Sequence, residues 1–279
     1  MEKRITEEIC RTLEQHGYRS PVLLGEGSFS VVYRVCDQKS RFWACKISEA
    51  GGQWERECHN SKEICHPRFP TYREHWTEGG KGYLVMEFWD GCDLRKMLGR
   101  RGRLSPEQAG RIALQISEGL QYLHERPYPF LYRDLKPENI RIRVDGSAGI
   151  LDLGCLWNRE QEWSGAGNRS YSAPEQFVQG EIPGEESDVY AVGKILAAML
   201  GEEADEVKRG QKGSARQNKS KKTGRKQRRQ ENWLRKISAM ATCGERKDRI
   251  PDIKTLRTLL AVSDASGRER RRAYRAADF

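Results

Sequence analysis

Residues 132–139 read YRDLKPEN. This stretch brings Asp134, Lys136 and Asn139 close together in the chain. A carboxylate can orient or deprotonate a hydroxyl, a lysine can neutralise a phosphate, and an amide oxygen suits a hard cation such as Mg²⁺. Taken alone, Asp134 could equally be an acid in a surface loop. The motifs around the stretch decide between these interpretations.

Four further motifs flank this stretch. Residues 25–30 read GEGSFS and residues 44–46 read ACK, whereas residues 152–154 read DLG and residues 173–175 read APE. A glycine pair between strands is by itself most often an ordinary turn, and DLG alone is also typical of a turn. Chance does not supply five such motifs in this order.

The ordered motifs resemble those of the eukaryotic-type protein kinase family over about residues 19–262. The resemblance implies an α+β fold of two lobes. The N-lobe, residues 19–88, is expected to be small and β-rich with one key helix, and the C-lobe, residues 89–262, to be larger and mainly helical. A helix in residues 1–18 and a basic tail in residues 263–279 complete the expected organisation.

Local patterns predict the main elements of both lobes. Alternating and β-branched residues in 21–48 predict two or three antiparallel strands, and residues 82–88 predict another. Ser105 and Pro106 begin a long core helix, with Ser as the N-cap and Pro in the first turn. Further helices are expected at residues 53–65, 188–200, 233–241 and 253–260.

The resemblance implies catalytic roles for four residues. Asp134 would act as the base or orienting group for an acceptor hydroxyl, and Lys136 would support the moving γ-phosphoryl group. Lys46 would neutralise the phosphates of ATP and needs an acidic partner. Glu57 has the family's spacing, nine residues before His66, although a solvated helix glutamate is the alternative.

The cofactors implied by the resemblance are ATP and Mg²⁺. Asn139 and Asp152 would hold the metal through oxygen ligands. Backbone N–H groups of a loop without bulky side chains can approach phosphates closely. The residues expected to contact ATP are Gly25, Gly27, Ser28, Phe29, Val32, Ala44, Lys46, Met86, Glu87, Phe88, Trp89, Asp93 and Arg141.

Some of these ATP contacts have a more specific expected role. Met86 would be the gatekeeper before a hinge at residues 87–89, and Asp93 would bond the ribose. Arg141 departs from the family, which usually has an apolar residue there as the floor under adenine. Either its aliphatic stem lies under the ring, which we favour, or the nucleotide site is weakened or regulated.

Regulatory and structural residues follow from the same resemblance. Arg133 would anchor a phosphorylated activation segment, in which Ser164 is the first candidate and Ser170 the second. The residues expected to brace the C-lobe are Glu175, paired with Arg249, and Asp188, which would hold the backbone of the catalytic loop.

The net charge of +10 is concentrated in two segments. Residues 207–230 contain eleven Lys and Arg and no acid, and residues 268–275 contain five Arg and one Glu. The first segment is of low complexity and is expected to be disordered. It is either a solvated loop or a site for an anionic partner, namely nucleic acid, an acidic protein or a membrane surface.

The sequence therefore predicts an ATP- and magnesium-dependent serine/threonine protein kinase, because Lys136 is typical of kinases that act on Ser or Thr. The alternatives are a pseudokinase or scaffold that binds anionic partners, and a small-molecule phosphotransferase of related fold. No apolar run approaches the roughly 18 residues of a membrane span, so a cytoplasmic location is expected. The segments at residues 66–70, 129–139, 172–177 and 187–193 look like soluble kinase domains of Gram-positive bacteria.

Overall fold

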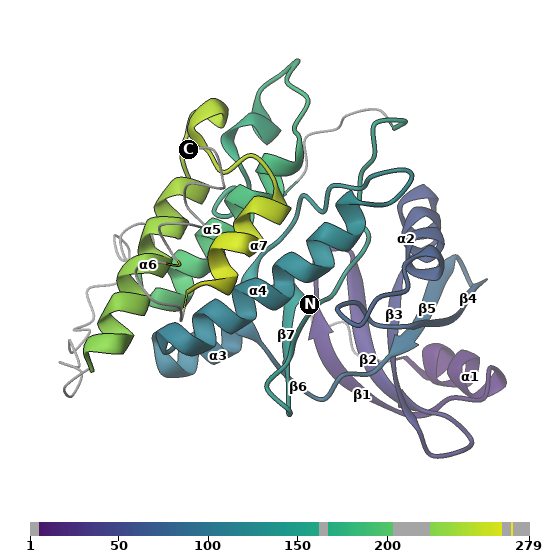
Figure 1. The fold of residues 1–279 in the computed structure, drawn as a ribbon. Helices are drawn as coiled ribbons and strands as arrows, with labels where there is room; N and C mark the ends of the chain where they lie inside the picture. Colours follow the sequence, from purple (N-terminus) through teal and green to yellow (C-terminus); the bar gives the residue numbers. More distant parts are fainter. Residues whose placement is uncertain (1–5, 162–166, 203–223, 264–268, 270–279) are drawn as a thin grey trace, which may run out of the picture. The chain divides into compact units, whose positions relative to one another are not determined.

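The computed structural model describes residues 6–161, 167–202, 224–263 and 269. The chain forms two compact units (Figure 1). Of the described residues, the first unit comprises 6–91 and 151–156, and the second comprises 92–150 and those from 157 onward. The first unit therefore extends a few residues beyond residue 88, where the expected N-lobe ends. Residues 151–156 belong to the first unit because Asp152 and Leu153 bond to side chains of that unit.

The first unit is a five-stranded antiparallel sheet with two helices. The strand order is β1-β2-β3-β5-β4. The strands are β1 (Arg19–Glu26), β2 (Ser30–Cys36), β3 (Phe42–Glu49), β4 (Tyr72–Glu78) and β5 (Lys81–Glu87), and the helices are α1 (Glu7–Gln15) and α2 (Gly52–Glu63). The helix predicted within residues 1–18 is observed as α1, in the central part of that range. The Thr6 side chain caps it by accepting the N–H of Ile9.

The two faces of this sheet bury different helices. Side chains alternate between the faces along each strand. One face carries Tyr33, Cys45 and Val85, and these residues form a core with Ile9 and Leu13 of α1. The opposite face carries Leu84, which packs with Trp54 and Cys58 of α2. The α2 face therefore also receives the residues of β2 and β3 that alternate with the α1 core.

The second unit is mainly helical. Its helices are α3 (Leu94–Arg101), α4 (Pro106–His124), α5 (Glu185–Leu200), α6 (Arg225–Ala241) and α7 (Ile253–Ala261), with 3₁₀ turns η1 (Pro137–Asn139), η2 (Pro174–Phe177) and η4 (Arg246–Asp248). The short strands β6 (Gly91–Asp93), β7 (Ile140–Arg143) and β8 (Ala148–Ile150) form a small sheet in the order β6-β7-β8. Helix α4 packs against α5 and α7, and α5 packs against α6.

The predicted start of α4 is confirmed. The Ser105 hydroxyl accepts the N–H of Gln108 at 3.2 Å, and the Gln108 side chain accepts the Ser105 N–H, which together form a capping box. The buried side of α4 includes Ala109, Ile112 and Leu120. This apolar side anchors the helix in the core of the second unit.

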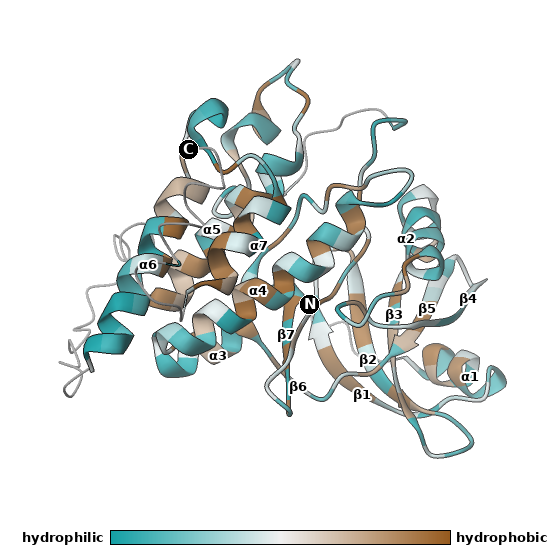
Figure 2. Ribbon diagram, in the orientation of Figure 1, coloured by the Kyte–Doolittle hydropathy of each residue, from teal (hydrophilic) through white to brown (hydrophobic). Residues whose placement is uncertain are grey.

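The expected disorder of residues 207–230 is wrong for residues 225–230, because α6 begins at Arg225 rather than near Trp233. Lys, Arg and Gln have good helix propensity, and no Gly or Pro interrupts residues 225–241. Figure 2 shows these first turns of α6 in hydrophilic colours. Residues 207–223, and residues 268 and 270–275 of the basic tail, lie outside the described residues.

None of the helices in the described part of the chain is long and apolar enough to cross a membrane.

Candidate functional site

Lys46 is paired with two carboxylates in the first unit. Its Nζ lies 2.6 Å from Oε1 of Glu57 and 3.1 Å from Oδ1 of Asp152. The Lys46 and Glu57 side chains are only 13% and 7% exposed, whereas that of Asp152 is 40% exposed. The structure thus brings together three residues that are far apart in the sequence, and it gives Lys46 the partner expected from the spacing of Glu57.

The charges in this cluster stabilise one another. Burial alone would lower the pKa of Lys46, but the carboxylates of Asp152 and Glu57 outweigh burial and hold that pKa above its ordinary value. Burial raises the pKa of the Glu57 carboxyl, and the Lys46 ammonium opposes that rise. Lys46 is consequently a fixed cation beside an acid that remains partly accessible.

Asn60 is a positioning residue that sequence reasoning missed. Its side-chain N–H donates to the carbonyl oxygen of Leu153 at 3.2 Å, and Asn60 is 4% exposed. It lies three residues after Glu57, so both side chains project from the same side of α2. Helix α2 therefore holds both Lys46 and the backbone next to Asp152. The available signal was a polar residue three positions after Glu57 in the same predicted helix.

The backbone around Asp152 is tightly constrained. Asp152 has a positive φ of 64°, and its Oδ1 accepts the N–H of Gly154 at 3.0 Å. A Cβ at Gly154 would lie 3.1 Å from Asp152 Oδ1 and 3.2 Å from Glu57 Oε2. A side chain at position 154 would thus crowd the acidic pair. Strained residues of this kind are concentrated at functional sites.

The expected adenine and phosphate residues of the first unit share the Lys46 face of the sheet. Val32 of β2 lies opposite Gly25 of β1 on one side and opposite Lys46 of β3 on the other. Ala44 of β3 lies opposite Met86 of β5. Directly paired residues, and residues two apart in a strand, lie on the same face. The half-buried side chains of Val32, Ala44 and Met86 therefore line one surface with Lys46.

The glycine loop lies at the open end of β1 and β2. Residues 25–29 are exposed, and Phe29 is 78% exposed. The Gly27 N–H donates to the Ser30 carbonyl oxygen at 2.8 Å, which closes the turn around Ser28. A Cβ at Gly25 would meet no atom within 4 Å. There is open space above this backbone.

The expected hinge begins at Glu87, the last residue of β5, and continues through Phe88 and Trp89, which have no regular structure. The Glu87 N–H donates to the carbonyl oxygen of Thr71 at 2.8 Å, and the Glu87 carboxylate accepts from the Thr71 hydroxyl at 3.2 Å. The Phe88 ring packs edge-on against Phe42 at 6.3 Å between ring centroids. Trp89 is buried. The segment is held in place by its neighbours in the first unit.

Asp134, Lys136 and Asn139 lie together in one loop of the second unit. Lys136 Nζ lies 2.6 Å from Asp134 Oδ2. The Asn139 amide nitrogen donates to the Asp134 carbonyl oxygen at 3.0 Å. Because this bond uses the nitrogen of the amide, the amide oxygen is the atom left to bind a metal ion. Oxygen donors of Asn139 and Asp152 suit magnesium chemically.

Asp188 holds the backbone of this loop, as expected. Its Oδ2 accepts the N–H of Tyr132 at 2.8 Å, and its Oδ1 accepts the N–H of Arg133 at 3.0 Å. Arg133 has a positive φ of 68°, and its carbonyl oxygen accepts from Gln176 Nε2 at 3.1 Å. Hydrogen bonds on both sides thus compensate the strained backbone immediately before Asp134.

His124 is a second residue that sequence reasoning missed. It ends α4, and its side chain is 2% exposed. Nε2 lies 2.9 Å from Asp188 Oδ2, and Nδ1 lies 3.2 Å from Glu185 Oε2. Burial lowers the pKa of His124, but hydrogen bonds and charges of Asp188 and Glu185 raise it to about 9. A protonated His124 therefore bridges two carboxylates.

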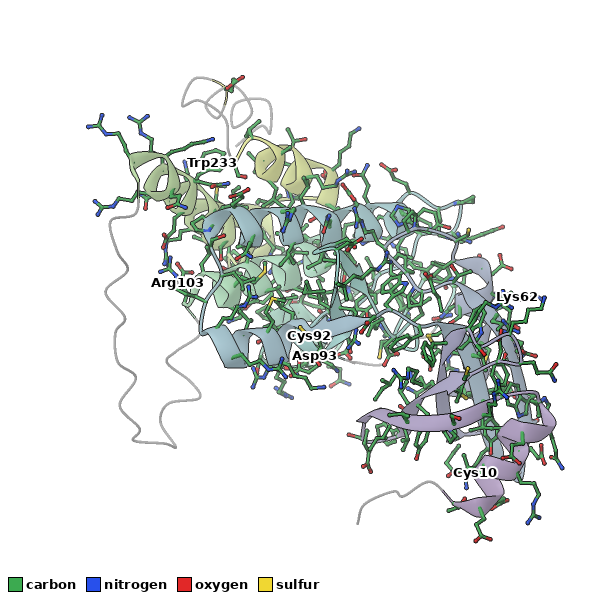
Figure 3. The ribbon with its side chains drawn as sticks, turned by 90° about the horizontal axis from the view of Figure 1, so that it is seen from below. Cys10, Lys62, Cys92, Asp93, Arg103 and Trp233 are labelled. Atoms are coloured by element: carbon green, nitrogen blue, oxygen red, sulfur yellow. The ribbon has the colours of Figure 1, made fainter. Side chains whose placement is uncertain are left out.

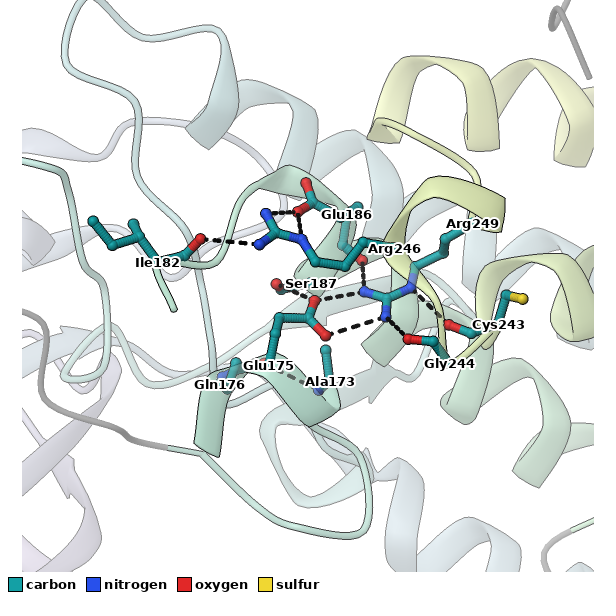
Figure 4. A network of polar contacts seen from close by, with 10 residues as sticks. All are labelled: Ala173, Glu175, Gln176, Ile182, Glu186, Ser187, Cys243, Gly244, Arg246 and Arg249. Atoms are coloured by element: carbon teal, nitrogen blue, oxygen red, sulfur yellow. Dashed lines mark hydrogen bonds and ion pairs between the residues drawn. The ribbon is translucent and has the colours of Figure 1, made fainter. Parts of the chain in front are cut away.

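Glu175 and Arg249 form the expected buried ion pair (Figure 4). Arg249 NH1 and NH2 lie 2.6 and 3.1 Å from the two carboxylate oxygens of Glu175. The guanidinium also donates to the carbonyl oxygen of Cys243 at 3.0 Å. Burial raises the pKa of Glu175, but the bonds from Arg249 and Ser187 hold it below its ordinary value. The pair ties η2 to the segment before α7.

The other expected contacts in the second unit are individually placed. Asp93 is the N-cap of α3 and accepts the Lys96 N–H at 2.7 Å. Arg141 is half-buried on β7, and it alternates with the buried Ile140 and Ile142, so it faces the opposite side of that strand. Asp93 thus already has a structural role.

Only part of the expected regulatory segment is visible. Ser164 lies outside the described residues. Ser170 is exposed, and its N–H donates to the Asn168 side chain at 3.0 Å. The neighbouring Ser172 is buried and donates to the Arg133 carbonyl oxygen at 3.3 Å. Of the two serines that the structure describes here, Ser170 is exposed and Ser172 is buried.

Comparison with known proteins identifies similar chains. Residues 18–256 match the family model described as the protein kinase domain. CBL-interacting protein kinase 17 of Oryza sativa subsp. japonica is 32% identical over 199 residues, which cover 66% of this chain and 43% of that protein.

Two other relatives are a probable serine/threonine-protein kinase MRK1 homolog of Encephalitozoon cuniculi (strain GB-M1) and serine/threonine-protein kinase tousled-like 1 of Homo sapiens. The first is 27% identical over 205 residues, covering 71% of this chain and 64% of that protein. The second is 32% identical over 209 residues, covering 64% of this chain and 27% of that protein. The chain thus spans less than two thirds of the length of each of these relatives.

Proposed function

The chain belongs to the protein kinase domain family, and we propose that it transfers the γ-phosphoryl group of ATP to Ser or Thr hydroxyls of proteins. The observation that carries this proposal is the pairing of the buried Lys46 with Glu57 and Asp152. Phosphoryl transfer asks a protein mainly for fixed charge and positioning. A scaffold has no need of a buried lysine held between two acids.

The residues of the first unit would bind the nucleotide. Lys46 would neutralise its phosphates, and the exposed backbone N–H groups near Gly25 and Gly27 would approach them. Val32, Ala44 and Met86 offer an apolar surface beside Lys46, which suits an adenine ring. When bound, Mg²⁺ would neutralise charge on the phosphate oxygens, and Asp152 and Asn139 would hold it through oxygen atoms.

The residues of the second unit would act on the acceptor. Asp134 would orient the acceptor hydroxyl and accept its proton, while Lys136 would stabilise charge on the transferred group. Asp188 supports this geometry because it fixes the backbone of Tyr132 and Arg133 next to Asp134. Asp93 would bond the ribose, and the stem of Arg141 would lie beneath adenine.

The acceptor class is inferred from Lys136, which is typical of kinases that act on Ser and Thr, and from the similarity to two relatives named as serine/threonine-protein kinases. Phosphoamino-acid analysis tests it directly. A generic basic protein incubated with the chain, Mg²⁺ and labelled ATP should yield labelled phosphoserine or phosphothreonine and no phosphotyrosine. The Lys46→Met variant should yield neither, and label chiefly on tyrosine would contradict the proposal.

Regulation by phosphorylation is a further part of the proposal. A phosphate on Ser170 or Ser164 would add about −1.5 to −2 charge to the activation segment, and Arg133 would anchor it. The exposure of Ser170 supports its candidacy. Mass spectrometry of active protein and the activity of Ser164→Ala and Ser170→Ala variants would test each serine separately.

Three finer expectations remain predictions. They are the likeness to soluble kinases of Gram-positive bacteria, the cytoplasmic location, and an anionic partner for residues 207–230 and 268–275. The pseudokinase or scaffold remains the alternative for the whole chain. It would bind anionic partners through its basic segments without transferring phosphate.

A further inference from the structure

A small pocket lies in the second unit between α3, the first half of α4 and the turn that follows β7. Its volume is about 190 Å³. Its floor is apolar, because Leu104, Ile112 and Ile142 are only 2%, 3% and 6% exposed. Sites for small molecules commonly measure about 300 to 1,000 Å³. This pocket is therefore better suited to one or two apolar side chains of a peptide.

The rim of the pocket is basic. Arg101, at the end of α3, and Arg111, on α4, both line the pocket and are exposed. Neither forms an ion pair with any residue in the described part of the chain. One acid lies in the turn after β7: the Asp145 carboxylate, which accepts the N–H and hydroxyl of Ser147 at 2.8 and 2.7 Å and keeps its negative charge. Glu107, in the first turn of α4, is the other nearby acid.

Two other basic residues, one on α3 and one in the turn after it, are already paired. Lys96 lies 3.0 Å from Asp93. Arg103, just beyond α3, lies 3.1 Å from Glu231. Figure 3 labels Asp93 and Arg103, which mark the two ends of this helical segment. Arg143 also lines the pocket but has an interaction of its own, so Arg101 and Arg111 are the pocket-lining cations that no described residue engages.

The pocket is connected to the candidate catalytic loop. Its wall includes Ile142 of β7, which follows Asn139 by three residues. Helix α3 packs against both η1 and β7. A chain that is bound in the pocket would therefore be tethered to the unit that carries Asp134, which raises the effective concentration of an attached acceptor.

We propose that this pocket is a docking site for an acidic segment of a protein substrate, which inserts apolar side chains between α3, α4 and β7. The inference rests on the proposed function for its assignment to substrates. Arg101 and Arg111 complement acidic groups at the rim, and such charges chiefly affect association and specificity. The buried apolar floor provides the anchor that a purely electrostatic surface lacks.

Binding is tested first, without any requirement for activity. The probe is a fluorescein-labelled peptide with two leucines among glutamates and aspartates, measured by anisotropy against the full chain. The Arg101→Glu/Arg111→Glu double variant should bind about tenfold more weakly. The matched control, Arg228→Glu, reverses an exposed charge on α6 and should bind like the wild type.

Two competing probes establish what the pocket recognises. A peptide with serines in place of the leucines should bind much more weakly than the parent peptide. If it binds equally well, or if single-stranded RNA binds with the same dependence on Arg101 and Arg111, the surface is a general polyanion site and the proposal is overturned. Equal binding of the parent peptide to the wild type and the double variant also overturns it.

An activity measurement separates this proposal from the proposed function. The docking peptide is fused to a generic acceptor, and the fusion should have a lower KM than the acceptor alone in the wild type but not in the double variant. The kcat/KM of the acceptor alone should be unchanged. Phosphorylation of both acceptors with equal KM overturns the docking site alone. Arginine-dependent binding without phosphorylation of any acceptor supports the docking site and contradicts the kinase assignment.

Discussion

The imidazole Nε2 of His124 lies 2.9 Å from the Oδ2 atom of Asp188, and both side chains are buried. The same Asp188 accepts the backbone N–H groups of Tyr132 and Arg133. Helix α4 thus acts on the candidate catalytic loop through a buried chain of hydrogen bonds. Such networks are strong when every member is satisfied, because the local dielectric constant is low.

The His124 interaction predicts a pH-dependent contribution to stability. The pKa of His124 is raised to about 9 in the folded state, compared with about 6.5 for an unperturbed histidine. The stabilisation is therefore fully present below about pH 6.5 and is lost as the pH rises through about 9. Urea unfolding should show that His124→Gln is less stable than the wild type near pH 6, with a difference that shrinks toward pH 9.5.

The control for this experiment is His59→Gln, because His59 is exposed on α2. That variant should match the wild type at each pH. A difference between His124→Gln and the wild type that stays constant with pH would contradict a protonated His124.

The Glu175–Arg249 pair predicts a large effect on stability. Arg249→Met leaves the buried Glu175 carboxylate without its partner and should lower the free energy of unfolding by about 3 to 5 kcal/mol. Arg246 is the matched control, because it pairs with Glu186 nearby but its side chain is 40% exposed. Arg246→Met should cost about 1 kcal/mol or less. Similar losses for the two variants would show that burial does not determine the contribution of Arg249.

The Lys46–Glu57 contact predicts a loss of activity with a largely retained fold. Glu57→Gln removes the charge that orients Lys46 and should lower kcat/KM by about 10². Glu55→Gln changes an exposed residue of the same helix and should leave kcat/KM near the wild-type value. Steady-state kinetics with varied ATP would measure both. Full activity of Glu57→Gln would show that the Lys46–Glu57 contact is not needed for catalysis.

Two glycines predict opposite outcomes. A Cβ at Gly82 would lie 2.4 Å from the Trp54 ring of α2, so Gly82→Ala should destabilise the chain by about 1 to 3 kcal/mol through overpacking.

A Cβ at Gly25 would meet no atom within 4 Å, so the Gly25→Ala variant should keep the melting temperature of the wild type. If the Gly25 backbone approaches phosphate, the KM for ATP should rise. An unchanged KM would exclude that close approach.

The sequence predicted those contacts that depend on spacing within an ordered set of motifs. Lys46 with Glu57, Glu175 with Arg249, and Asp188 with the loop at residues 132–133 are of this kind. The family resemblance connected segments that periodicity alone could not pair.

The remaining features depend on tertiary context. Asn60 and His124 are polar residues on packed helices, and their partners lie 93 and 64 residues further along the chain. The first turns of α6 were missed because a run of basic residues predicts solvation but does not by itself prevent a helix. Residues 151–156 join the first unit through bonds to Lys46 and Asn60, which no local pattern encodes.

The most direct test of the kinase assignment is the initial rate of phosphate transfer from labelled ATP to a generic basic protein in the presence of Mg²⁺. The wild type should transfer phosphate, Asp134→Asn should be slower by at least about 10², and Glu138→Gln, which changes a side chain of the same loop that is 46% exposed, should be close to the wild type. Transfer by Asp134→Asn at the wild-type rate would contradict the role of Asp134. ATP binding by the wild type without any transfer would contradict the assignment of the chain as an enzyme.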